Sequence, residues 1–136
     1  MTRQDRAEYK PKGTLIEQTV ISWLNRYFAA EMPAVKAYAE EPEHKEPAKV
    51  KPGRFVTVHL LGGGEHNKLG DAFLAVRSYA PTRYEAAVLD SFVRDAMHRI
   101  TELDEVASCK LNSYYDYTRE DKDQPRYQSV FDIVHY

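Results

Sequence analysis

Apolar residues recur at three- and four-residue spacing in two stretches of the chain, and each stretch predicts an amphipathic helix. The first is expected to begin at Thr14, which forms a capping box with Glu17, and to continue to about position 30. The second is expected to follow a capping box made by Thr82 and Glu85 and to continue to about position 103. The apolar faces consist of Ile16, Val20, Trp23, Leu24, Tyr27 and Phe28 in the first helix and Ala86, Leu89, Phe92, Val93, Ala96, Ile100 and Leu103 in the second.

Alternating apolar and polar residues, or runs of β-branched residues, predict five strands. These are expected over Val35–Ala39, Arg54–Leu61, Asp71–Tyr79, Val106–Tyr115 and Arg126–Tyr136. The second and third strands predict an antiparallel hairpin, because a glycine-containing connection, Gly62–Gly70, joins them and would form an extended tip. The last two strands are joined by a polar loop, Thr118–Pro125.

The resulting order is helix, strand, strand, strand, helix, strand, strand. It predicts an α+β fold with a mostly antiparallel sheet, two main helices packed on one face and a long protruding β-hairpin. A chain of 136 residues is the usual size of one domain, which we expect over residues 14–136. Residues 1–13 contain four basic residues but no apolar periodicity, and Glu41–Lys51 is charged and contains proline. We expect a flexible arm and a solvated loop, respectively.

The composition is that of a folded protein. With 43% hydrophobic and 29% charged residues, the chain has enough apolar surface to offset the loss of chain entropy. A net charge of −2 and the lack of a long basic run argue against a sequence-specific nucleic-acid binder. Cys109 is the only cysteine, which excludes an intrachain disulfide and a cysteine-rich zinc site. No apolar stretch suits a signal peptide or a membrane span, so we expect a soluble, cytoplasmic product without a membrane partner.

The residues that could carry chemistry do not form a catalytic motif. Gly62–Gly64 is followed by an acidic residue and a strand, whereas a phosphate-binding loop requires Lys and Ser or Thr opening a helix. His59, His66 and Asp71 lack the spacing that places two metal ligands on one face. The candidate nucleophiles, none beside an evident base, are Cys109, Ser78, Ser91 and Ser113. We therefore expect no catalytic residue, metal or cofactor, and a function other than catalysis.

Two features leave a structural and an interface interpretation open. Tyr114, Tyr115, Tyr117 and Tyr127 gather around the last pair of strands, with Tyr136 at the end of the chain. Exposed tyrosines favour protein interfaces, whereas tyrosines on a two-residue period line a core. The long hairpin is compatible both with docking onto a neighbouring subunit and with a mobile surface loop.

The segment Lys51–Val58 resembles the Arg-Pro-x-Arg-Phe-Val-x-Val segment of the tail terminator, or tail-completion, family of long-tailed bacteriophages. In that family glycines, an acidic residue opening the next strand and an alanine-rich helix follow. Here Gly62–Gly64, Asp71–Val76 and Ala86-Ala87 stand in the same order. Arg126–Val130, after a polar and acidic stretch, is similar to the family's C-terminal ending. The resemblance covers about residues 14–136.

The resemblance implies a virion-assembly protein of a phage or prophage. Such subunits form a ring, expected here to be a homohexamer, that caps the tail tube, ends tail growth and provides the joint to the head connector. Expected partners are other copies of the chain, the major tail tube protein and a head–tail connector protein, with genome DNA passing through the ring. Expected locations are the host cytoplasm during assembly and the head–tail junction of the virion. Residues expected at subunit or tube contacts are Arg54, Gly62, Gly63, Gly64, His66, Asn67, Lys68, Asp71, Arg77, Tyr115, Tyr117, Arg126 and Tyr127.

Other functions remain open from the sequence. A head-closure or adaptor protein would act on the head side of the same joint, and a tail tube protein would polymerise beyond one ring. From a different class, a small metal-dependent hydrolase would have to use His59, His66 and Asp71.

Overall fold

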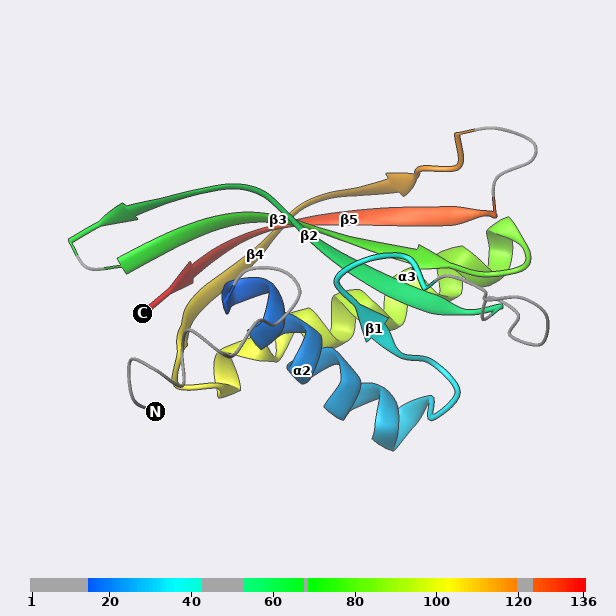
Figure 1. The fold of residues 1–136 in the computed structure, drawn as a ribbon, viewed down its shortest axis with the longest axis horizontal. Helices are drawn as coiled ribbons and strands as arrows, with labels where there is room; N and C mark the ends of the chain where they lie inside the picture. The colour runs from blue at the N-terminus through cyan, green and yellow to red at the C-terminus, as the bar shows by residue number, and fades with distance from the viewer. Residues whose placement is uncertain (1–14, 43–52, 68, 120–123) are drawn as a thin grey trace.

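The computed structural model describes residues 15–42, 53–67, 69–119 and 124–136, which form one α+β domain (Figure 1). The expected arm, the expected cap Thr14, nearly all of the charged loop and part of the last polar loop lie outside these residues. The elements are α2 (Leu15–Glu31), β1 (Ala37–Tyr38), β2 (Phe55–His66), β3 (Leu69–Tyr79), α3 (Arg83–His98), the 3₁₀ helix η1 (Ile100–Glu102), β4 (Val106–Asp116) and β5 (Arg126–His135).

The five strands form a single sheet in the order β1-β2-β3-β5-β4. The short β1 pairs with β2 in parallel, and every other pairing is antiparallel. The chain leaves β3 through α3, forms the edge strand β4, and returns through β5 into the middle of the sheet. The predicted fold class and the predicted order of helices and strands are confirmed.

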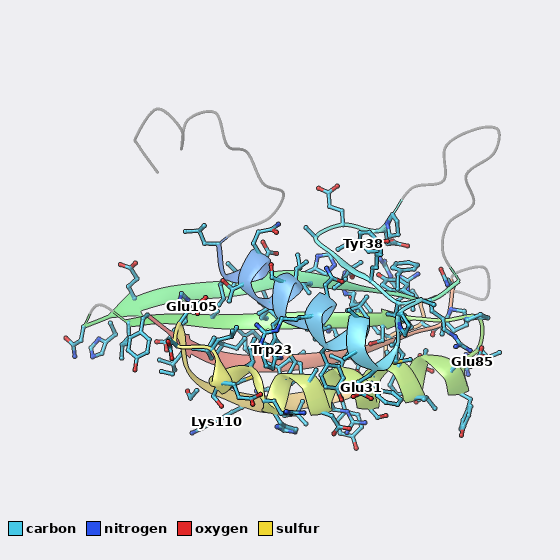
Figure 2. All side chains as sticks on the ribbon, turned by 90° about the horizontal axis from the view of Figure 1, so that it is seen from below. Trp23, Glu31, Tyr38, Glu85, Glu105 and Lys110 are labelled. Carbon is cyan, nitrogen blue, oxygen red and sulfur yellow. The ribbon has the colours of Figure 1, made fainter. Side chains whose placement is uncertain are left out.

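Both helices cover the same face of the sheet (Figure 1). Successive residues of a strand point to opposite faces, so alternate residues of β2, β3 and β5 meet the helices. The core under α2 and α3 includes Val20, Leu24, Phe28, Val56, Val58, Leu74, Val76, Leu89, Val93, Phe131 and Ile133. Trp23 lies between the two helices, and its Nε1–H donates to the Ala96 carbonyl at 2.7 Å (Figure 2). Neither helix of the described chain is long and apolar enough to cross a membrane.

The start of α3 follows its sequence signal. Thr82 is the N-cap in extended backbone conformation, and its Oγ1 accepts from the backbone N–H of Glu85 at 3.1 Å. This bond satisfies one of the backbone donors that a helix start leaves unpaired. The α-helix ends at His98, and the chain continues beyond Arg99 as η1. The helical stretch therefore ends close to position 103 as predicted, but its last turn is a 3₁₀ helix.

The segment Gly62–Gly70 is not a loop, and the prediction of an extended glycine-containing tip is wrong. β2 continues to His66 and β3 begins at Leu69, with cross-strand pairing from Gly62 opposite Phe73 to His66 opposite Leu69. The tip is confined to the residues between His66 and Leu69, where Asn67 has the positive φ of 52° that tight hairpin turns require. The hydrogen bonds between β2 and β3 outweigh the low intrinsic propensity of glycine for β-strands.

One of the buried carboxylates, Asp90, joins α3 to the sheet. Asp90 of α3 is fully buried, and it accepts hydrogen bonds from Ser129 Oγ and, at 3.0 Å, from Arg94 Nε. The Arg94 guanidinium carbon lies 3.8 Å from the centroid of the Tyr114 ring. Burial raises the pKa of Asp90, while the hydrogen bond from Ser129 and the charge of Arg94 oppose that rise. The network ties α3 to β5 and β4.

Candidate assembly surface

The face of the sheet turned away from the helices, called the outer face here, differs between its two ends. Where β2 begins and β3 ends, aromatic and arginine side chains lie over the backbone. We call this set the arginine–tyrosine layer; it consists of Tyr38, Phe55, Arg77, Tyr79, Tyr115, Tyr117, Arg126 and Gln128. Where the β2–β3 hairpin ends, glycines leave the backbone without side chains. Figure 1 shows this hairpin extending past both helices.

Stacked rings form the centre of the arginine–tyrosine layer. Phe55 and Tyr79 lie opposite each other on β2 and β3, with centroids 4.4 Å apart and planes 10° from parallel. The Arg126 guanidinium carbon lies 4.6 Å from the Tyr79 centroid, and Tyr38 meets Phe55 edge-on at 6.5 Å. Phe55 and Tyr79 are 0% and 1% exposed, although they face away from the helices. This end of the outer face is therefore a second, smaller core.

A polar chain continues the layer across β3, β5 and β4. Arg77 Nε donates to Gln128 Oε1 at 2.8 Å, and Gln128 Nε2 donates to the Tyr115 hydroxyl at 2.6 Å. The Arg77 guanidinium carbon also lies 4.9 Å from the centroid of the Tyr117 ring, which meets Tyr115 edge-on. Among the described residues the partners of Arg77 are neutral, so its positive charge is held by hydrogen bonding and cation–π attraction.

At the other end lies the glycine strip, defined as Gly62, Gly63 and Gly64 of β2. It follows a β-bulge at Leu61, and all of residues 61–67 are exposed. A Cβ at Gly62 or Gly64 would have no atom of the described chain within 4 Å, while one at Gly63 would approach the Asp71 carbonyl at 3.2 Å. Glycine within a strand costs about 0.5–1 kcal/mol relative to alanine. At Gly62 and Gly64 no atom of the described chain would prevent a larger residue.

Gly70 provides the contrast within the same hairpin. It lies opposite His135 of β5, and a Cβ added at Gly70 would overlap the His135 ring. Glycine is therefore required at this position by the packing of the chain itself. The hairpin thus contains one glycine explained by an internal neighbour and two that are not.

Apolar and acidic side chains surround the glycine strip. Gly62 and Gly64 lie opposite Phe73 and Asp71, whose side chains point to the outer face together with Asp132 of β5. Phe73 is 39% exposed and Leu61 48%. A shallow depression of about 300 Å³ is lined by Gly62, Gly63, Asp71, Ala72, Phe73, Asp132, Ile133 and Val134. Such a surface, apolar with an acidic border and a close approach to backbone, suits a protein contact.

Helix α2 closes the sheet edge next to the hairpin. The Asn25 side chain bonds both backbone groups of Ala37 in β1, accepting from N–H at 2.7 Å and donating to the carbonyl at 3.2 Å. Further along, the Leu60 N–H of β2 donates to Glu17 Oε2 at 2.8 Å. These side chains bond to backbone groups of the sheet edge, as a neighbouring strand would, as far as Leu60. Beyond it, no hydrogen bond from α2 to the Gly62–His66 edge of β2 occurs among the described residues.

The predicted contact residues fall into separate groups. Gly62, Gly63, Gly64, His66, Asn67 and Asp71 lie in the exposed hairpin; Arg77, Tyr115, Tyr117 and Arg126 lie in the arginine–tyrosine layer. Arg54 forms an ion pair with Glu85 at the start of α3, and its side chain is 48% exposed. Tyr127 lies opposite Ser78 and Asp116 and points to the helix-covered face. Lys68 lies outside the described residues.

The residues considered for chemistry are not gathered into a site. Nε2 of His59 lies 2.9 Å from Thr57 Oγ1, and burial, reinforced by Arg77, lowers the pKa of His59. Burial, reinforced by the charge of Asp132, raises the pKa of Cys109 to about 12, which keeps its thiol protonated. Ser78 Oγ is buried without a hydrogen-bond partner in the described chain. No group of three or more His, Cys, Asp or Glu suited to a metal occurs among the described residues.

Several residues of these surfaces were not singled out from the sequence. Phe55, Tyr79 and Gln128 read as ordinary strand residues, because their partners come from other strands. Phe73 and Asp132 become notable only once β3 and β5 are paired beside the glycine strip. The available signal was the run Phe55–Val58, which is mostly apolar instead of strictly alternating and therefore indicates a strand covered on both faces.

No protein-family model matches this chain, and no similar sequence was found among curated proteins.

Proposed function

We propose that this chain is a phage virion-assembly protein of the tail-terminator type. Its copies form a ring, most simply a hexamer, on the end of the growing tail tube. The ring ends the addition of tube subunits and presents the surface to which the head connector binds. The partners are other copies of the chain, the tube protein and the connector, and the site of action is the head–tail junction.

The exposed β2–β3 hairpin is the observation that carries this proposal. Its residues 61–67 are exposed, yet they are held in regular pairing with β3, and β5 accompanies β3 as far as Gly70. A rigid, exposed strand pair beyond the helical layer stabilises the isolated subunit little, because it buries little apolar surface. Such an element fits a subunit whose contacts are completed by neighbours.

The chemistry of the surface also favours assembly over catalysis. The exposed surface includes residue types that protein interfaces use: Tyr115 of the arginine–tyrosine layer, which is 42% exposed, and exposed Phe73 and Leu61 beside the bare backbone of the glycine strip. A ring needs one patch of each subunit to meet a different patch of the next, a heterologous contact that closes on itself. A chain with two unlike ends meets that requirement.

Deleting the gene from its phage or prophage, followed by induction and negative-stain electron microscopy of the lysate, tests the proposal. Abnormally long tubes beside tailless heads are expected, because tube growth then lacks its stop. Supplying the wild-type gene in trans should restore normal tails and serves as the control. Tails of normal length lying free beside filled heads would place the protein on the head side of the joint instead. Intact infectious particles would overturn an assembly role.

A further inference from the structure

We propose that the N-terminal segment of this chain, residues 1–13, turns back along α2 and occupies a groove between α2 and η1. The proposal goes beyond virion assembly, because it concerns a contact within one copy of the chain and requires no other protein. It rests on the lining of the groove, on the reach of the segment and on the order of charges along both.

The groove follows the side of α2 that faces η1. Two depressions, of about 320 and 290 Å³, share Trp23, Arg26 and Leu103 in their linings. The first extends to Leu15 at the start of α2, and the second extends to Glu31 at its end. Because they share residues, they form one groove along the length of the helix.

The lining of the groove leaves apolar surface uncovered. Leu15 is 84% exposed, and Tyr27 and Leu103 are half-buried beside Trp23. A chain segment that lies over such surface removes it from water, which stabilises the contact. Tyr9, the aromatic residue of the N-terminal segment, supplies a ring for this purpose.

The N-terminal segment has the reach to follow the whole groove. α2 has 17 residues, so it is about 25 Å long at about 1.5 Å per residue. An extended chain covers about 3.3 Å per residue, so roughly eight residues span the same distance. A segment that turns back at Leu15 therefore brings Arg6 to the far end of the groove. Lys10 and Lys12 then lie at its near end.

The groove presents charges in the order negative, positive, negative. Glu105 lies at its beginning, Arg26 in its middle and Glu31 at its end, as Figure 2 shows for the two carboxylates. All three are exposed, and none forms an ion pair with another described residue. Glu102, the remaining acidic residue of the lining, pairs with Arg99 at 3.4 Å.

The N-terminal segment presents the opposite order. Counted back from α2, Lys12 and Lys10 come first, Glu8 follows and Arg6 comes next. In the extended register these side chains meet the negative, positive and negative groups of the groove in turn, and residues 3–5 extend beyond it. Opposite charges at three successive places fix the direction in which the segment lies.

Limited trypsin digestion of the purified full chain, with mass spectrometry to follow the release of residues 1–6, tests the proposal. At low salt, cleavage after Arg6 should be slower by roughly tenfold or more in the wild type than in Glu105→Lys or Tyr9→Ala. High salt should remove the protection, because the contact joins opposite charges. Glu65→Lys, on the exposed hairpin, is the matched control and should be cleaved like the wild type.

Charge exchange identifies the groove as the site. The variant Lys10→Glu/Lys12→Glu should lose the protection, and adding Glu105→Lys should restore most of it. Thermal unfolding should show an intact fold in each variant, since the replaced groove residue is exposed.

Four outcomes would overturn the proposal. Wild-type chain cleaved after Arg6 as fast as Glu105→Lys at low salt would mean that the segment does not occupy the groove. Protection lost equally in Glu65→Lys, or not restored by the charge exchange, would assign it to overall charge. Protection that increases with protein concentration would place the segment in the groove of a second copy.

Discussion

The two ends of the outer face differ in how far side chains cover the sheet. At one end, Phe55 and Tyr79 are 0% and 1% exposed, with Arg126 over the Tyr79 ring. At the other, the glycine strip leaves strand backbone open and keeps Phe73 partly exposed. Both ends belong to the same two strands, β2 and β3. The difference reflects the side chains of these strands and the presence of β1, which pairs with β2 only at the covered end.

This contrast suggests that the two ends of one hairpin have different roles. The covered end stabilises the subunit, because its rings are removed from water within the chain. The bare end contributes little to the subunit and remains available to a partner. Substitutions of the covered rings should therefore change the free energy of unfolding, and substitutions in the glycine strip should change association.

The largest expected effect is the difference in stability lost when two phenylalanines of the outer face are each replaced by alanine. Phe55→Ala should lower the free energy of unfolding by about 3–5 kcal/mol, because it leaves a cavity beside Tyr79. Phe73→Ala should lower it by only about 1–2 kcal/mol, since Phe73 is already 39% exposed. Chemical denaturation of both variants measures the difference, and equal losses would contradict the difference in roles.

The buried carboxylate on the helix-covered side should give the next largest effect. Asp90→Ala removes two hydrogen bonds, one of them from a charged donor, and should cost about 1.5–3 kcal/mol. Denaturation at neutral pH measures it. Ser91→Ala, at the adjacent position on α3, removes only a hydroxyl that bonds the Val88 carbonyl and is the control.

Asp90 also predicts a direction for the pH dependence of stability. Its pKa is raised above 3.8 in the folded protein, so the folded chain binds a proton more readily than the unfolded chain. Relative to Asp90→Asn, the wild type should therefore gain stability as pH falls from neutral toward 3.8 and lose it as pH rises through the folded pKa. Thermal unfolding of both proteins across that range measures the difference. Other titrating groups, such as Asp116, cancel in the comparison; a constant difference would argue against a raised pKa.

A smaller effect should distinguish the glycines of the hairpin. Gly70→Ala should destabilise by roughly 1–2 kcal/mol, because the new Cβ must displace the His135 ring. Adding His135→Ala should relieve most of the strain, whereas Gly64→Ala alone should be neutral or slightly stabilising. A double-mutant cycle by thermal unfolding gives the coupling. Additive effects of Gly70→Ala and His135→Ala would contradict the packing argument.

The smallest expected effect concerns the Arg54–Glu85 ion pair. Both side chains are partly exposed, at 48% and 33%, so Arg54→Ala should change the free energy of unfolding by about 0–1 kcal/mol. A small value measured by denaturation means that any loss of association in Arg54 variants reflects a lost contact. A loss above about 2 kcal/mol would show that Arg54 acts within the subunit instead.

Local signals predicted much of the fold. The capping box of Thr82 and Glu85 located the start of α3, and apolar periodicity located both helices. The glycine strip misled the prediction, because strand pairing there depends on β3 and β5 rather than on the glycines themselves. The insertion of β5 between β3 and β4 is likewise a long-range pairing that alternation within a strand does not encode.

The candidate surface was predictable only in part. Exposed arginines and tyrosines were identifiable by type, and Arg77 and Tyr117 do meet. Their arrangement was not, because the contact between Arg77, Gln128 and Tyr115 joins three strands through side-chain geometry. Tyr127 points to the opposite face because the register of β5 places it across from Ser78 of β3 and Asp116 of β4.

The two side chains with which α2 closes the sheet edge have a consequence for newly made protein. An open strand edge invites other chains to add strands, which leads to aggregation when subunits accumulate before use. Asn25 occupies both backbone groups of Ala37, and Glu17 occupies the N–H of Leu60, so these positions of the β1–β2 edge cannot pair with an added strand. Helix α2 thus protects one edge of the sheet as far as Leu60, and the edge beyond Leu60 is where that protection ends.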